Sequence, residues 1–80
     1  MYGIYMDLKK VTSSLILQIG YDPSSEILVV QFRNGSYYQY DNVSEQMYQN
    51  MMESASVGKY FSAYIKNTRP YKQIFINEEL

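Results

Sequence analysis

The feature that most constrains this 80-residue chain is a β-hairpin over residues 26–41, in which two strand-forming runs meet at Asn34-Gly35. A two-residue type I′ turn there would put Tyr38 and Tyr40 on one face with Ile27, Val29 and Gln31. A three-residue loop over residues 33–35, with Gly35 as a G1 bulge, shifts the register by one residue. Both tyrosines then share a face with Leu28, Val30 and Phe32. The turn therefore decides what the tyrosines contact.

We favour the three-residue loop because the preceding strand agrees with it. Residues 21–26 are expected to contain a four-residue loop whose flanking residues, Tyr21 and Glu26, face each other, since Pro23 fixes φ and Asp22 can form an Asx turn. Counting back from this loop pairs Ile19 with Leu28, Leu17 with Val30 and Leu15 with Phe32, and the bulged register extends that apolar face to the two tyrosines. The opposite face is mixed and only partly dry, with Ile16, Gln18, Ile27, Val29, Gln31, Tyr37 and Gln39. One face of the sheet is thus expected to form the core.

After the hairpin the apolar spacing changes from two residues to about 3.6. Ser44 is the expected N-cap of a helix over residues 45–54, and Ser56 starts a second helix that ends near Asn67. The side chains expected on the buried sides of the two helices are Met47, Tyr48, Met51, Met52 and Ala55, then Val57, Tyr60, Phe61, Tyr64 and Ile65. The methionines are interpreted as adaptable core filler.

These elements predict an α+β fold: an antiparallel β-meander of three or more strands, followed by two helices packed on one sheet face. The first strand of the meander is expected over residues 11–21, and residues 71–76 read as one more short strand of unassigned position. The predicted organisation is an N-terminal extension over residues 1–10, a domain over 11–67 and a C-terminal extension over 68–80.

The composition excludes several classes of function. The chain has no histidine and no cysteine, so the commonest general base, the commonest metal ligand and the thiol nucleophile are all missing. Its carboxylates are scattered through turns and helix starts. We therefore predict no enzymatic activity, no catalytic residues, no metal and no cofactor. No apolar run reaches membrane-spanning length and no signal peptide is recognisable, which predicts a cytoplasmic protein without a membrane partner.

The start of the second helix is the first candidate binding site. Ser56, the backbone N–H groups around Gly58, and Lys59 could hold a phosphate or another anion. The residues alone favour a simpler interpretation, in which Ser56 is an ordinary N-cap and Gly58 packs against the sheet. Ser13 and Ser14 either lie near this site or reflect polarity at the start of a strand.

The second candidate is aromatic. Tyr37 projects to the mixed face in the favoured register, where stacking of a nucleic-acid base would contribute about 1–3 kcal/mol per base. Arg33 on the hairpin loop supplies positive charge. Further cations that need not share its face are Lys59, Lys66, Arg69 and Lys72. A net charge of −1 argues against a strong hold on a long polyanion.

Several separated motifs occur in a familiar order. They are Val11-x-Ser13-Ser14, Gly20-Tyr21-Asp22, Leu28-x-Val30-x-Phe32, Gly35, Tyr38-x-Tyr40, Val43, and Ala55-Ser56-x-Gly58-x-Tyr60-Phe61 with Ile65. Together they resemble the KTSC domain, a short module named from its occurrence at the C-terminus of some lysyl-tRNA synthetases and also found alone in small bacterial and phage proteins. The chain departs from the family at Ser44, where a proline usually follows Val43, and in its terminal extensions.

The resemblance implies a non-catalytic module that binds RNA or another nucleic acid, with Tyr38, Tyr40, Ser56 and Gly58 as the family's hallmark residues. Our leading hypothesis is a binding module for nucleic acid or a nucleotide-type phosphate ligand. Its site would join the start of the second helix to Ser13, Ser14, Arg33 or exposed tyrosines. The alternative is a protein-interaction or inhibitor module, for example a phage-encoded protein that sequesters a host defence protein or a nucleotide signal. Pairing of edge strands would also allow a homodimer.

Overall fold

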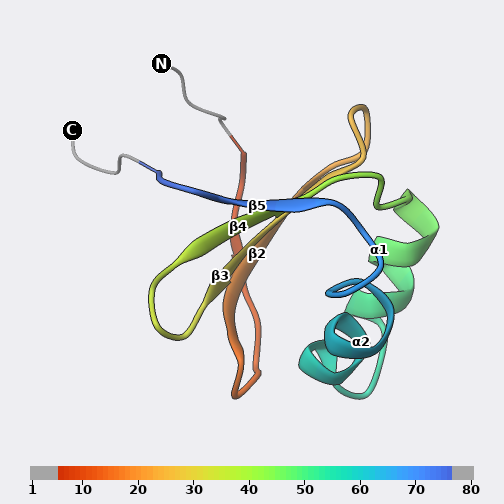
Figure 1. The fold of residues 1–80 in the computed structure, drawn as a ribbon. Helices are drawn as coiled ribbons and strands as arrows, with labels where there is room; N and C mark the ends of the chain where they lie inside the picture. The colour runs from red at the N-terminus through yellow and green to blue at the C-terminus, as the bar shows by residue number, and fades with distance from the viewer. Residues whose placement is uncertain (1–5, 77–80) are drawn as a thin grey trace.

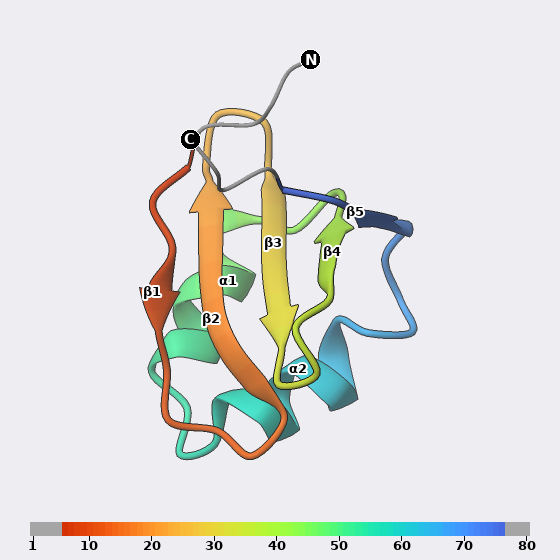
Figure 2. The ribbon, with the colours of Figure 1, turned by 90° about the vertical axis from the view of Figure 1, so that its left-hand side faces the viewer.

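The computed structural model of the chain describes residues 6–76, which form one antiparallel sheet and two helices (Figure 1). The elements in chain order are β1 (Lys9–Lys10), β2 (Ile16–Asp22), β3 (Ile27–Phe32), β4 (Tyr37–Tyr40), α1 (Glu45–Met52), α2 (Val57–Tyr64) and β5 (Tyr71–Ile74). Neighbouring strands follow the order β1-β2-β3-β4-β5. Both helices lie on the same side of this sheet (Figure 2). The predicted α+β fold is confirmed.

The β3–β4 turn has the three-residue form that the sequence favoured. The N–H of Phe32 donates to the carbonyl of Ser36, and Gly35 adopts a φ of 96°. Leu28 therefore pairs with Tyr40 and Val30 with Tyr38. The turn chemistry and the alternation of apolar residues agree here, and the predicted placement of both tyrosines is confirmed.

The predicted pairing of β2 with β3 is wrong. Ile19 pairs with Val30 rather than with Leu28, because Glu26 takes a left-handed φ of 58° and the four-residue loop moves to residues 23–26. The Asx turn at Asp22 does form: its carboxylate accepts hydrogen bonds from Ser24 and Ser25, which hold the pKa of Asp22 below its usual value.

A second correction concerns the start of β2. The register shifts between Ile16 and Gln18, so that Leu17 is an extra residue and Ile16 pairs with Phe32. This bulge turns Ile16 into the core, where it is completely buried, whereas Leu15 is only partly buried against the core and Leu17 does not join it. The strand begins at Ile16 and not at residue 11, and the preceding segment forms a loop.

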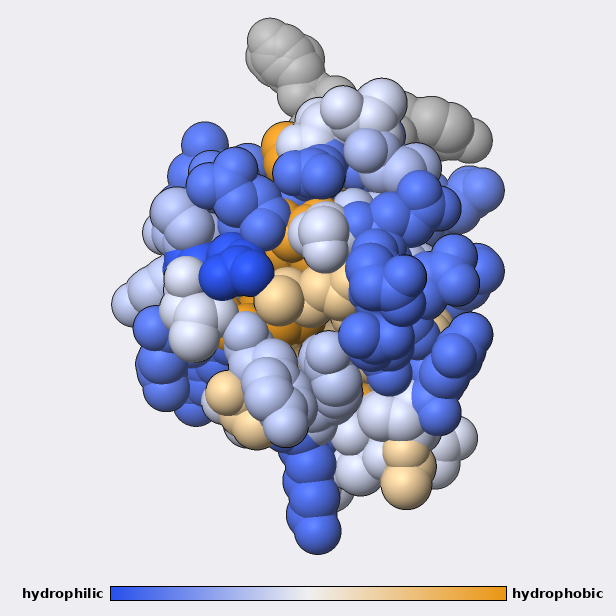
Figure 3. Space-filling model, turned by 90° about the vertical axis from the view of Figure 1, so that its right-hand side faces the viewer, coloured by the Kyte–Doolittle hydropathy of each residue, from blue (hydrophilic) through white to orange (hydrophobic). Residues whose placement is uncertain are grey.

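The core lies between the sheet and the two helices. Ser44 and Ser56 are N-caps, as predicted, although both helices end earlier than expected, at Met52 and Tyr64. Tyr64 is 56% exposed and therefore lies outside the core, contrary to the predicted pattern. Figure 3 shows the molecule from the side on which the helices lie, where hydrophobic residues gather in a central hollow bordered by hydrophilic ones. The buried cluster consists of Ile16, Ile19, Leu28, Val30, Tyr40, Val43, Met51, Phe61 and Ile65.

The opposite face of the sheet is drier than predicted. Val29, Tyr37 and Gln39 are all buried there. Gly20 lies on the same face, and a Cβ added to it would meet the side chains of Met6 and Leu8 at 2.6 and 2.7 Å. The segment before β1 thus packs against the sheet, although its sequence shows no strand periodicity. In the described part of the chain, no helix combines the length and hydrophobicity needed to cross a membrane.

Candidate functional site

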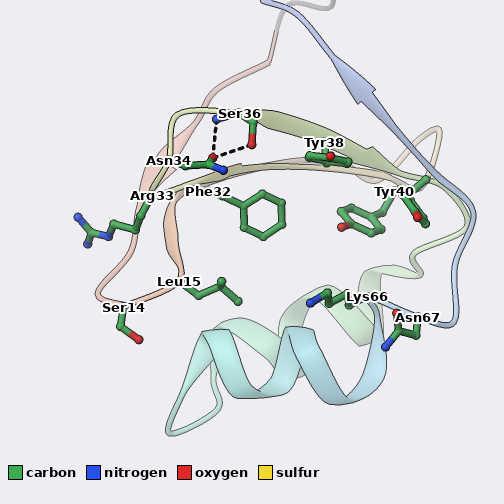
Figure 4. A pocket seen from close by; sticks show the side chains of 11 residues that line it. Ser14, Leu15, Phe32, Arg33, Asn34, Ser36, Tyr38, Tyr40, Lys66 and Asn67 are labelled. Atoms are coloured by element: carbon green, nitrogen blue, oxygen red, sulfur yellow. Dashed lines mark hydrogen bonds between the residues drawn. The ribbon is translucent and has the colours of Figure 1, made fainter.

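A pocket of about 460 Å³ lies between the β3–β4 hairpin and the end of α2 (Figure 4). The hairpin contributes its loop and the side chains on its helix-facing surface. The turn after α2 and the first residue of β5 form the opposite wall. The lining residues are Ser14, Leu15, Phe32, Arg33, Asn34, Ser36, Tyr38, Tyr40, Lys66, Asn67 and Tyr71.

Aromatic rings form one wall of this pocket. Tyr38 lies between two of them, with its ring centroid 5.6 Å from that of Phe32 and 6.0 Å from that of Tyr71. The three-residue turn brings Tyr38 to the face of Phe32, and the pairing of Tyr40 with Tyr71 adds the last ring. Tyr71 remains 61% exposed, so its ring is open to a ligand.

Tyr40 contributes to the pocket mainly as its support. It is only 3% exposed, and its ring contacts Phe61 at 5.1 Å and Tyr71 at 5.7 Å. Burial, with smaller contributions from Tyr38 and Tyr71, raises the pKa of Tyr40 to about 12. Its phenol is therefore neutral at physiological pH and cannot serve as a base there.

Two cations and several neutral polar groups complete the pocket. Arg33 is fixed at the hairpin side, where its Nε donates to the carbonyl of Ser13 at 3.0 Å and its guanidinium points outward at the rim (Figure 4). Asn34 Oδ1 accepts from the N–H and the hydroxyl of Ser36, at 2.9 and 2.7 Å. Lys66 comes from the opposite side, just after α2. The pocket thus combines flat apolar surface with positive charge at two of its sides.

A second pocket, of about 480 Å³, lies at the start of α2 and contains most of the site predicted there. It brings together Ser13, Ser14, Ser56, Gly58 and Lys59, which come from two distant parts of the chain. The hydroxyl groups of two of these serines are already engaged, however. Ser56 accepts from the N–H of Lys59, and Ser13 accepts from the N–H groups of Leu15 and Ile16.

Gly58 has a structural reason to be glycine. A Cβ at this position would lie 2.8 Å from the hydroxyl oxygen of Ser13. This close approach lets α2 pack against the loop before β2. The local roles of these residues correspond to the simpler interpretation, in which Ser56 caps the helix and Gly58 is a packing glycine.

The predicted site residues therefore separate into three places. Arg33, Tyr38 and Tyr40 lie at the first pocket, Ser13, Ser56, Gly58 and Lys59 at the second, and Ser14 at both. Tyr37 lies on the opposite face of the sheet and is only 7% exposed, so it offers no open stacking surface. In the part of the chain that the structure describes, no group of three or more acidic residues could hold a metal ion.

Sequence reasoning missed Lys66, Asn67 and Tyr71 as parts of a site. Lys66 is recognisable as a cation from the sequence, but only the packing of α2 on the sheet brings it opposite Arg33. Tyr71 belongs to a strand whose place in the sheet was not predicted. The spacing of Tyr38 and Tyr40 is the one local signal, because it implies an aromatic face that a further strand could extend.

Comparison with known proteins identifies the family of this fold. A family model described as the KTSC domain matches residues 12–71. The crystal structure of a KTSC domain protein from Yersinia pestis superposes with a TM-score of 0.84 at 41% sequence identity, covering 89% of this chain and 100% of that one.

Relatives are also found by sequence. An uncharacterized protein from Stutzerimonas stutzeri is 37% identical over 54 residues, which cover 68% of this chain and 76% of the relative. A lysine–tRNA ligase from Nostoc punctiforme is 28% identical over 71 residues, which cover 89% of this chain but only 13% of the ligase.

Proposed function

Since this chain belongs to the KTSC domain family, we propose that it is a non-catalytic binding module whose first pocket holds a nucleotide-type ligand. The observation that carries the proposal is the meeting of an exposed aromatic ring, Tyr71, with two cations, Arg33 and Lys66, around one pocket. A nucleotide has the matching chemistry, because a flat base can stack on a ring while its phosphate pairs with nearby cations.

The dimensions and charges of the pocket favour a single nucleotide unit. Its volume of about 460 Å³ lies within the ordinary range of small-ligand sites. Asn34, Ser36 and Asn67 line it and offer donors and acceptors to a sugar or a base edge. The net charge of −1 disfavours contact with many phosphates at once. The unit is either a free nucleotide or one residue of an RNA strand.

One relative supports the RNA source. The lysine–tRNA ligase of Nostoc punctiforme contains a stretch related to this chain, and by its name that enzyme acts on a tRNA. A module attached to such an enzyme has reason to contact RNA. Under this proposal the same pocket would take an unpaired nucleotide of the RNA.

Isothermal titration calorimetry with mono-, di- and cyclic nucleotides and a short RNA tests the proposal. We expect Lys66→Ala and Tyr71→Ala each to weaken binding at least about tenfold, or about 1.4 kcal/mol. Lys72→Ala is the matched control, because it removes an equal charge from the residue next to Tyr71. Lys72 pairs with Gln39, so its side chain lies on the other face of the sheet from the pocket. Comparison of the RNA with the free nucleotides identifies the source of the ligand.

Lys59→Ala distinguishes the two pockets. Loss of binding in this variant, with Lys66→Ala unaffected, would place the ligand at the start of α2 and contradict the proposed site. If the protein binds none of the nucleotides and no RNA, the proposal of a nucleotide-type ligand is itself contradicted. Its function would then be sought in the alternative class, a protein-interaction or inhibitor module.

A further inference from the structure

The outer edge of β5 presents backbone N–H and C=O groups that another strand could pair with. The N–H of Asp41 donates to the carbonyl of Pro70, and the same register pairs Gln39 with Lys72 and Tyr37 with Ile74. Hydrogen-bonded pairs alternate along an antiparallel ladder. In β5, Lys72 and Ile74 therefore direct their backbone N–H and C=O groups toward β4. The backbone groups of Tyr71, Gln73 and Phe75 consequently point away from the sheet. Among residues 6–76, no strand lies beyond β5.

Two aromatic side chains of this edge are exposed to solvent. Tyr71 is 61% exposed and Phe75 is 86% exposed, and strand alternation places both on the face that carries the first pocket. The opposite edge of the sheet differs, because β1 consists of two exposed lysines. Lysines on an edge strand discourage pairing with another chain. β5 carries a single lysine, Lys72, so the sheet is less protected at β5 than at β1.

We propose that a second copy of this chain pairs antiparallel with β5, in a register centred on Gln73. The two sheets then join into one, related by a twofold axis that passes between the two Gln73 residues. Residues opposite each other in an antiparallel pair lie on the same face of the sheet. Tyr71 thus lies opposite Phe75 of the partner subunit, and the two most exposed rings of the edge cover each other.

The alternative registers are less favourable. A register centred on Lys72 sets two ammonium groups directly opposite each other, which is destabilising in a cross-strand pair. A register centred on Ile74 sets Gln73, not Tyr71, opposite the partner's Phe75, so the two exposed rings no longer cover each other. In the register centred on Gln73, Lys72 lies opposite the partner's Ile74, and the two Gln73 amides can bond to each other.

This dimer also changes the pocket. Tyr71 forms part of the aromatic wall, so Phe75 of the partner subunit extends that wall on the side where it is open. Each protomer thereby contributes a residue beside the other's pocket. The dimer itself does not depend on what the pocket binds.

Sedimentation equilibrium of the full chain gives the first test. The parent protein should be a dimer, and Gln73→Lys should convert it to monomers, because it sets two positive charges together at the twofold axis. Tyr64→Ser is the control, since it removes an exposed ring that belongs to α2 and not to the edge strand, and should leave the dimer intact. Circular dichroism confirms that both variants are folded. A monomeric parent, or a Gln73→Lys variant that stays dimeric, overturns the proposal.

Oxidative cross-linking gives the register, because the chain contains no cysteine of its own. Residues paired across the axis have Cα atoms about 5.5 Å apart, within reach of a disulfide, whereas diagonal neighbours are about 7–8 Å apart. Gln73→Cys should therefore cross-link efficiently, and Lys72→Cys and Ile74→Cys should not. Preferred cross-linking through position 72 or 74 would overturn the proposed register.

Discussion

At the scale of single residues, the contact between Gly58 and Ser13 shows why position 58 is a glycine. The Ser13 hydroxyl is held by two backbone N–H groups, so it cannot move easily from a Cβ at position 58 that would lie 2.8 Å away. We expect Gly58→Ala to lower the free energy of unfolding by about 1–3 kcal/mol. Urea denaturation measures this cost.

The Ser13→Ala background provides the matched control. Without the hydroxyl, the nearest atom to the new Cβ is Leu15 Cβ at 3.7 Å, an ordinary contact. Alanine is favoured over glycine in a helix by about 0.5–1 kcal/mol, so Gly58→Ala should become neutral or stabilising there. Additive effects of the two substitutions would show that the contact does not limit position 58.

Tyr40 should make the stability of the protein depend on alkaline pH. A phenol with a higher pKa in the folded state binds its proton more tightly when folded, so its contribution is fully present below its unfolded pKa of 10 and is lost as the pH rises toward about 12. At about 1.4 kcal/mol per pKa unit, the loss approaches about 3 kcal/mol. Urea denaturation of the parent and of Tyr40→Phe, between pH 9 and 12, should show that the parent loses more stability than the variant as the pH rises. Parallel curves would assign the alkaline loss to other tyrosines.

At the scale of elements, the β3–β4 turn depends on its glycine. Gly35 has a φ of 96°, and a Cβ added there would meet no other atom within 4 Å, so a substitution acts through the backbone alone. Gly35→Ala should cost about 1–3 kcal/mol, and Gly35→Asn less, because asparagine tolerates positive φ better. Thermal denaturation compares the two. Equal costs would mean that the backbone at position 35 relaxes to negative φ.

The two turns of the meander show what the sequence can and cannot predict. At Gly35, the preference of glycine for positive φ and the apolar alternation lead to the same register. At the β2–β3 loop, a glutamate adopts positive φ, and nothing in the residue type indicates this. The run Leu15-Ile16-Leu17 is apolar at every position, so its periodicity could not reveal which residue is extra in the bulge.

The candidate pocket was predictable only where it depends on one element. The hairpin register placed Tyr38 and Tyr40 on the helix-facing side from the sequence alone. Lys66 and Tyr71 reach the pocket through tertiary packing, from a turn and an edge strand that are distant in the sequence. The residue types at the start of α2 suit anion binding, yet the same types suit capping and close packing.

At the scale of the whole molecule, the boundary of the domain can be tested. The sequence predicted a domain over residues 11–67, whereas β5 pairs with β4 and Tyr71 contacts both Tyr38 and Tyr40. A chain that ends after Arg69 should lose this ring contact and the hydrogen bond from Asp41 to Pro70. We expect a loss of at least about 2 kcal/mol in the free energy of unfolding, which is a large fraction of the stability of so small a domain.

Tyr71→Ser separates the two contributions, because it keeps the strand and removes only the ring. If the ring provides most of the stabilisation, this variant should approach the truncated chain in urea denaturation. If the backbone pairing dominates, it should remain close to the parent. A truncated chain as stable as the parent would instead show that residues up to Arg69 suffice, and that β5 serves the pocket and the partner strand rather than the fold.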